Sequence, residues 1–555
     1  MRNLVFVSLV LRCTISRRVG RANHTDTSDT SPITVMPRKN LALEISLVVC
    51  ALLGAFIVQA VVSQTKPPKM PKFERSNYSE EIVGIVKGET VAISESEQPS
   101  NAIPVKYDKH QSALGHAPQW DLLDAYQYTV SRAEFIHLMS NVYSVGPYWK
   151  DWFTLEAEHV LIKTHGNDLS KTYKLAFQNE VVEAKPKKFW RTRVELGESS
   201  ESAPLLGLRI AIDPGHIGGD YAEIEHRRFI LKDGVPPIQE GNMTLTVAEL
   251  LMNQLESLGA TVHLVRDKNS PVNPFRPENY YAYAESKLIL NKSAVTEQSV
   301  KREADKLFYR NGEIRARAEL VNQELKPDIV LCLHFNADAE PDPEDPSLYE
   351  KEHFHMILNG AYTQSELAHD DERFQCVLKI LQGNHAEEAK LTAAAAASFH
   401  AESGLPPYQY TSNSSRAVNV DGNPFLWARN LIANRLYDCP VLYFEPYLMN
   451  GKDSYKRMQV GDYSGLGFVN GKLRPSIYRE YVNAVTKGLV NYYTAEIVVE
   501  KPPETLSKDP QVIDPLVKVA AEADPKELQS QPEDAASESA ESAEFDQSNS
   551  EVETE

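Results

Sequence analysis

The stretch LRIAIDPGHIGGD, residues 208–220, opens with an apolar strand and ends in a glycine-rich turn that carries His216. Four more apolar stretches are typical of strands, and they alternate with stretches typical of helices. Alternation of this kind predicts an α/β domain, phosphorylase/hydrolase-like, with a mostly parallel wound sheet and helices on both faces. The other expected strands are ATVHLVRD (260–267), DIVLCLHFN (328–336), HFHMILNG (353–360) and CPVLYFEP (439–446), and the main helices are TLTVAELLMNQLESLG (244–259), EIRARAELVNQEL (313–325) and SIYREYVNAVTKGLVNYYTAEI (476–497).

We expect this domain to span residues 206–497, with polar insertions at about 275–312 and at about 341–415. The second insertion contains an alanine-rich helix, AEEAKLTAAAAASFHAE, which is a candidate plug for a functional site. Ahead of the domain, residues 78–200 contain the strand-like stretches HVLIKTH and KTYKLAF and predict a small accessory α+β domain of unknown role. Its tryptophans are more typical of a core than of a sugar-binding surface.

The N-terminal part of the chain carries one apolar run, at residues 41–64, directly after Arg38 and Lys39. Its length and its positive flank are typical of a signal anchor or a signal peptide, and either one exports the rest of the chain. We expect residues 1–40 to be disordered and residues 65–77 to be a linker. The sequence therefore predicts a protein of the cell envelope or periplasm, either anchored to the inner membrane by residues 41–64 or secreted if that segment is cleaved.

The formal net charge of −19 is concentrated at the C-terminus, where residues 501–555 carry 15 acidic side chains and 4 lysines. This Pro-, Glu-, Ser- and Ala-rich segment has too few apolar side chains to fold, which predicts a disordered acidic tail over residues 498–555. No basic stretch exists that would attract a polyanion, so the composition argues against nucleic-acid binding. The five cysteines contain no CxxC pair and predict no disulfide framework.

Three of the expected strands end in polar side chains, namely His216, His334 and Glu445. In an α/β sheet, functional groups collect at the carboxyl ends of the strands. Each residue alone also fits a structural role, such as a buried histidine with a partner or a glutamate in an ion pair. Together they suggest a metal site, because two imidazoles and a carboxylate form a recurrent catalytic zinc set.

Residues from Ile210 to about Tyr493 resemble the zinc-dependent N-acetylmuramoyl-L-alanine amidases of the amidase-3 type. The resemblance rests on four motifs in the expected order. They are Asp-Pro-Gly-His ending at His216, Glu240 at the start of a helix, Cys-Leu-His-Phe-Asn-Ala around His334, and Glu-Pro-Tyr-Leu-Met-Asn beginning at Glu445. The sequence departs from the family pattern at Thr244, where Asn is usual, and in a longer stretch between His216 and Glu240.

The resemblance implies that His216, Glu240 and His334 bind one Zn²⁺ and that Glu445 is the general base. A zinc-activated water would then cleave the amide bond between N-acetylmuramic acid and L-alanine in peptidoglycan. It also leaves room for an activator protein that acts on the two insertions. Two other functions fit the same residues: a zinc peptidase acting on the stem peptide, and a non-catalytic peptidoglycan-binding or scaffold protein of the envelope.

Overall fold

The computed structural model describes residues 103–496, except 180–183, 198, 232–233, 338–347 and 411–415. The described residues all belong to one compact unit. The expected membrane segment at 41–64, the linker at 65–77 and the tail at 498–555 lie outside the described residues. Among the helices that are described, none has both the length and the apolar content needed to cross a bilayer.

A seven-stranded sheet forms the centre of the described unit, in the order β10-β11-β9-β12-β8-β4-β7. Four neighbouring pairs of strands are parallel, whereas β9 pairs antiparallel with β12 and β10 antiparallel with β11. The prediction of a mostly parallel sheet is confirmed. The strands are β4 (Arg209–Pro214), β7 (Thr261–Leu264), β8 (Ile329–Leu333), β9 (Phe354–Asn359), β10 (Val418–Asn419), β11 (Leu426–Arg429) and β12 (Val441–Pro446).

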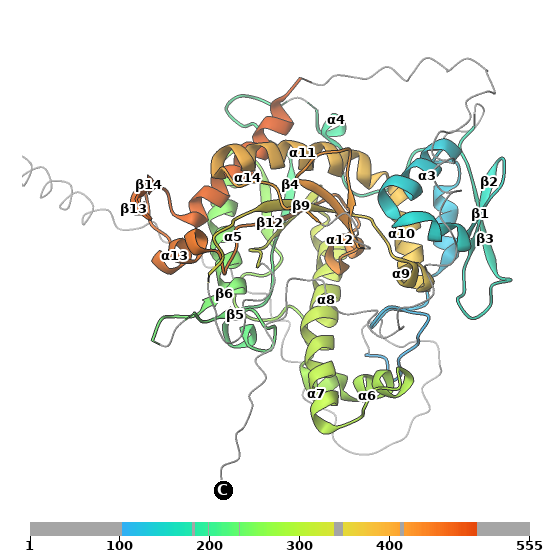
Figure 1. The fold of residues 1–555 in the computed structure, drawn as a ribbon. Coiled ribbons are helices and arrows are strands. Elements are labelled where there is room, and N and C mark those ends of the chain that lie inside the picture. The colour runs from blue at the N-terminus through green and yellow to red at the C-terminus, as the bar shows by residue number, and fades with distance from the viewer. Residues whose placement is uncertain are drawn as a thin grey trace, which may run out of the picture. The chain divides into compact units, whose positions relative to one another are not determined.

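Helices cover both faces of this sheet, as its buried strands β4, β8, β9 and β12 require. One core contains side chains such as Ile212, Leu331 and Phe444 and is covered by α5 (Glu240–Ser257), α11 (Asn384–Ser403) and α14 (Ile477–Thr494). The alternate side chains, such as Cys332 and Tyr443, form a second core with α8 (Glu313–Glu319) and α12 (Ile432–Leu436). In Figure 1, α11 lies on one side of the sheet and α8 on the other.

The alanine-rich helix α11 is part of the core and does not plug the site. Its Leu391, Ala395 and Phe399 are fully buried, and it packs along α14 and β9. Glycine at position 488 of α14 allows the two helices to approach closely beside Ala395, because a Cβ atom at 488 would lie only 2.7 Å from Cα of Ala395. No residue of α11 lines the pocket described below. The plug hypothesis was therefore wrong for this helix.

The first predicted insertion forms a helical projection made of η5 (Pro277–Tyr280), α6 (Tyr281–Leu290), α7 (Glu297–Lys306) and the π-helical turn η6 (Leu307–Gly312), which continues into α8 (Figure 1). Leu307 and Phe308 are fully buried within a small third core. The second insertion contains β9, α9 (Gln364–Ala368), α10 (Asp370–Gln382) and α11. Both insertions are therefore largely ordered elements of the domain.

The part of the expected accessory domain that is described contains a three-stranded antiparallel sheet and short helices. Trp120, Trp149 and Trp190 are buried, which agrees with a role in packing. Residues of this part share a continuous hydrophobic core with the central sheet. The elements are η1 (Trp120–Tyr126), α3 (Arg132–Leu138), η2 (Met139–Tyr143), η3 (Gly146–Asp151), β1 (Phe153–Leu155), β2 (His159–Lys163), β3 (Thr172–Ala176) and α4 (Arg193–Leu196).

A buried carboxylate joins the segment before α4 to the central sheet. Asp328 is fully buried, and its oxygens accept hydrogen bonds from Arg191 at 2.6 Å and from Arg209 at 2.7 Å. Burial alone would raise the pKa of Asp328, but the bonds from both arginines outweigh burial and lower it. The two ion pairs of Asp328, with Arg191 and with Arg209, fix the start of β4, the strand that leads to His216.

Candidate metal centre

His216 follows β4 in a strained turn that several groups hold in place. Its φ is 59°, in the left-handed region that costs non-glycine residues about 1–3 kcal/mol. The guanidinium of Arg317 donates to the His216 carbonyl at 2.8 Å, and buried Glu225 accepts hydrogen bonds from the N–H groups of Ile217 and Gly218. Glu225 also lies 3.6 Å from Nδ1 of His216, so the same carboxylate orients the ring.

Glycine at position 215 allows the two histidines to come together. A Cβ atom there would lie 2.4 Å from the ring of His334. The carbonyl of Gly215 accepts a hydrogen bond from Oγ1 of Thr244 at 2.7 Å. Thr244, which replaces the asparagine that is usual in the amidase-3 pattern, therefore ties α5 to the turn that precedes His216.

Glu240 is the first residue of α5, where the helix dipole favours a carboxylate. The start of this helix packs closely on the turn after His216, since a Cβ atom on Gly241 would lie 2.4 Å from the backbone nitrogen of Gly218. Glu240 also accepts a hydrogen bond from the N–H of Phe335 at 3.0 Å. The side chain is therefore held from both sides and is only 2% exposed.

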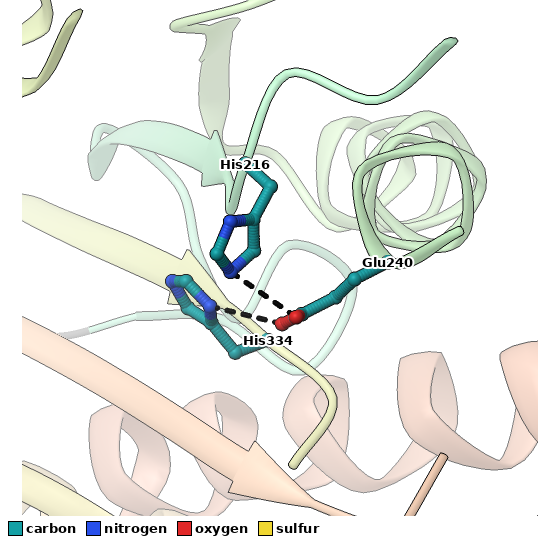
Figure 2. Close-up of side chains that lie close together, drawn as sticks. All are labelled: His216, Glu240 and His334. Carbon is teal, nitrogen blue, oxygen red and sulfur yellow. Dashed lines mark hydrogen bonds and ion pairs between the residues drawn. The ribbon is translucent and has the colours of Figure 1, made fainter. Parts of the chain in front are cut away.

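Figure 2 shows His216, Glu240 and His334 converging from β4, α5 and β8. Nε2 of His216 and Nδ1 of His334 lie 3.1 Å from the two carboxylate oxygens of Glu240. One ligand atom from each residue falls within 4.8 Å of the other two, close enough for the three to hold one metal ion. Two imidazoles and one carboxylate are a donor set that zinc takes in catalytic sites.

Charge in this cluster is strongly coupled. Burial alone would lower the pKa of His216, but Glu240 and Glu225 outweigh burial and raise that pKa to about 9. Burial alone would raise the pKa of Glu240, whereas His216 and His334 hold it well below its usual range. A metal cation would therefore find an ionised carboxylate, and it would have to displace a proton from His216.

Arg227, which the sequence analysis did not single out, contacts two of the three residues. Its Nε lies 3.3 Å from Nε2 of His216 and 3.3 Å from Oε2 of Glu240. The residue is 8% exposed. Its guanidinium therefore directs positive charge at the ligand atoms that a metal cation would use.

Glu445 lies near the end of β12, beside the strand of His334. Phe444 pairs with Leu333 in the parallel β12–β8 ladder. Glu445 and His334, the next residue in each chain segment, therefore lie side by side. Side chains alternate along a strand, which puts Glu445 on the same face as Tyr443. The Tyr443 ring stacks on the His334 ring with their centroids 4.6 Å apart. Glu445 is thus on the face of the sheet that carries the histidines, and it is half-buried.

A pocket opens over His216 and His334 on this face. Six of its fourteen lining residues are charged, and part of the wall comes from the first predicted insertion through Tyr309 and Arg310. Tyr443 and Ala433 contribute apolar surface. The remaining lining residues are Asp213, Gly215, Glu225, His226, Arg227, Glu313, Ile314 and Arg317.

A family model described as N-acetylmuramoyl-L-alanine amidase matches residues 210–344, the segment that contains His216, Glu240 and His334. The apo form of the N-acetylmuramyl-L-alanine amidase Ami1 from Mycobacterium abscessus is 17% identical, with 52% of this chain and 99% of that chain covered and a TM-score of 0.28.

Two further solved structures match at similar levels. The CwlD amidase from Clostridioides difficile, solved in complex with the GerS lipoprotein, is 13% identical, with 51% of this chain and 96% of that chain covered and a TM-score of 0.29. The amidase AmiC2 of Nostoc punctiforme is 13% identical, with 52% and 94% covered and a TM-score of 0.25. The search of curated proteins found no match.

Proposed function

We propose that this chain, whose residues 210–344 match an N-acetylmuramoyl-L-alanine amidase family model, hydrolyses the amide bond between N-acetylmuramic acid and L-alanine with the help of zinc. The observation that carries the proposal is the cluster of His216, Glu240 and His334 at the carboxyl ends of β4 and β8. In this proposal the three side chains hold one Zn²⁺, and Glu445 is the general base.

The roles follow from the chemistry of the side chains. When bound, zinc supplies a Lewis acid that polarises the substrate carbonyl and lowers the pKa of a water ligand. Glu225 and Arg317 keep His216 in its strained conformation. Glu445 takes a proton from the attacking water and returns it to the leaving amine. Tyr443 supports His334 by stacking on its ring.

The experiment that tests this proposal uses the full chain loaded with zinc. We expect Glu445→Gln to keep one zinc per chain, measured by elemental analysis, and to lose at least about 100-fold in turnover of muropeptides. Glu256→Gln, at an exposed position on α5, is the matched control and should behave like the wild type. Normal hydrolysis by Glu445→Gln would refute the role of Glu445.

Mass analysis of the digestion products separates the proposal from its alternatives. An amidase releases sugar chains together with intact stem peptides, whereas a zinc peptidase cuts within the stem peptide. A scaffold protein would release neither product. The ionised Glu240 carboxylate between two histidines favours a metalloenzyme over a scaffold protein.

Amidases of this family act on peptidoglycan, which locates the reaction in the cell envelope. We further propose that residues 41–64 tether the enzyme to the inner membrane or direct its secretion. An activator that moves the first insertion would act directly on the pocket, because Tyr309 and Arg310 are part of the pocket wall. Fractionation of cells that express the chain with or without residues 41–64 tests the membrane attachment. Equal amounts of the two forms in the membrane fraction would refute it.

A further inference from the structure

The pocket over the metal centre contains three arginines, and two of them are already bound to acidic partners. Arg317 lies 2.8 Å from an oxygen of Asp213 and 2.8 Å from an oxygen of Glu313. Arg227 contacts Glu240 and His216 at 3.3 Å. Within the described part of the chain, the side chain of Arg310 makes neither a hydrogen bond nor an ion pair. Arg310 is therefore the unpaired cation of this pocket.

The acidic side chains of the pocket are not available to Arg310. Glu225 accepts hydrogen bonds from two backbone N–H groups in the turn after His216. Glu313 accepts hydrogen bonds from the backbone N–H groups of Val272 and Asn273, at 3.1 and 2.9 Å, in addition to its ion pair with Arg317. Asp213 accepts from Arg317 and from the hydroxyl of Tyr437. Each carboxylate in the wall is thus satisfied by an internal donor.

Arg310 occupies a rigid position in the fold. It lies in the π-helical turn η6 between α7 and α8, and such turns occur frequently at functional sites. Leu307 and Phe308 of the same turn are fully buried. Gly312 packs against Tyr280 so closely that a Cβ atom would lie 2.2 Å from the tyrosine oxygen. The turn is therefore fixed, and it presents a half-buried guanidinium at the wall of the pocket.

We propose that Arg310 binds a carboxylate of the stem peptide and so makes the enzyme selective for stem peptides that carry this negative charge. This inference rests on the proposed function. A planar guanidinium matches the two oxygens of a carboxylate, and a partly buried, unpaired charge gains most from such a partner. The carboxylate nearest to the scissile bond belongs to the D-glutamate that follows L-alanine in the stem peptide. Many stem peptides carry an amide at that position instead.

Two substrates that differ only in this group test the proposal. Both are N-acetylmuramyl-L-alanyl-D-glutamate derivatives whose γ-carboxyl group is blocked as an amide, as it is by the next residue in a stem peptide; one has a free α-carboxylate (the acid) and the other an α-carboxamide (the amide). We expect the wild type to have a KM about 10-fold to 100-fold lower for the acid than for the amide, with similar kcat. Arg310→Gln should lose this preference by raising KM for the acid alone, and Arg310→Lys should retain part of it.

Arg302→Gln provides the matched control, since Arg302 is an exposed arginine on α7, in the same insertion and outside the pocket. It should keep the wild-type preference. Equal KM values for the two substrates in the wild type, or an unchanged preference in Arg310→Gln, would overturn the inference while leaving the amidase activity in place. If the wild type hydrolyses neither substrate, the proposed function fails. Calorimetric titration of the zinc-loaded protein with each compound then decides the role of Arg310, and equal or absent binding of the acid and the amide overturns it.

Discussion

Zinc binding to this protein should depend steeply on pH, because the metal competes with a proton on His216. Glu240 and Glu225 raise the pKa of His216 to about 9 in the metal-free protein. Zinc requires the neutral imidazole, so each ion that binds below this pH releases a proton from His216. We expect the apparent dissociation constant to fall about tenfold for each pH unit between 6.5 and 9, about 300-fold in total. Above pH 9 the curve should flatten.

The same pKa shift gives the metal-free protein a stability that depends on pH. A pKa raised from 6.5 to about 9 means that the folded protein binds this proton more tightly than the unfolded chain. The resulting stabilisation is fully present below pH 6.5 and is lost as the pH rises through 9. The pKa difference corresponds to about 3 kcal/mol. The zinc-loaded protein should not lose this stability, because its His216 carries no proton to release.

Competition with a chromophoric zinc chelator between pH 6 and 10 measures the affinity, after correction for protonation of the chelator. Calorimetry in buffers with different ionisation enthalpies counts the protons released. Glu225→Gln removes one of the two carboxylates that raise the pKa, so its curve should flatten at a lower pH. If the wild-type affinity is the same at pH 6.5 and 8.5 and no proton is released, the coupling of His216 to Glu240 and Glu225 is not as described.

Three further substitutions test the architecture around the metal centre. Gly215→Ala should lower zinc affinity about 10-fold to 100-fold with little effect on global unfolding, since its methyl group displaces the His334 ring; wild-type affinity would contradict this. Arg227→Gln should raise zinc affinity about tenfold, measured by chelator competition, because it removes a cation from the ligand atoms; exposed Arg228→Gln is the control, and a weaker affinity in Arg227→Gln would show that the arginine supports the site. Asp328→Ala should lower the free energy of unfolding by about 1–3 kcal/mol in urea, because it removes the shared hydrogen-bond acceptor of two arginines; no measurable loss would refute this structural role.

Five of the seven strands of the central sheet, β4, β7, β8, β9 and β12, were predicted from the sequence, whereas the short edge strands β10 and β11 were missed. The directions of the predicted strands were only partly predictable. Apolar runs such as 328–336 and 439–446 are typical of buried strands in any direction. The antiparallel course of β9 beside β12 depends on how the long second insertion returns to the sheet, and no local pattern records that path. The alanine-rich segment was correctly predicted to be a helix, but it was expected to plug the functional site and instead lies in the core. Its small side chains reflect the close contact of Ala395 with Gly488 of α14, which lies far along the chain.

The convergence of the candidate histidines that follow two strands was predictable for a physical reason. A histidine at the end of an apolar strand, such as His216 or His334, stands out against its neighbours, and parallel strands bring such ends together. Glu225 and Arg227 lie in a loop of mixed charges with no periodicity, where charged residues are usually solvated. Their burial follows from the turn after His216, which depends on a positive φ and on contacts with α5 and α8. The sequence carries no signal for that turn beyond its glycines.

The charge of the pocket is another property that the sequence alone does not predict. The chain as a whole has a net charge of −19, which on its own would suggest that it repels acidic ligands. Charge far from a site is screened within about 8–10 Å by salt, so the local pairing of side chains decides what a pocket attracts. In this pocket the carboxylates of Glu225, Glu313 and Asp213 already accept hydrogen bonds from other groups of the protein. Among the described residues, the charge of this pocket that is left without an internal partner is that of Arg310, so an acidic protein presents a cation in this pocket.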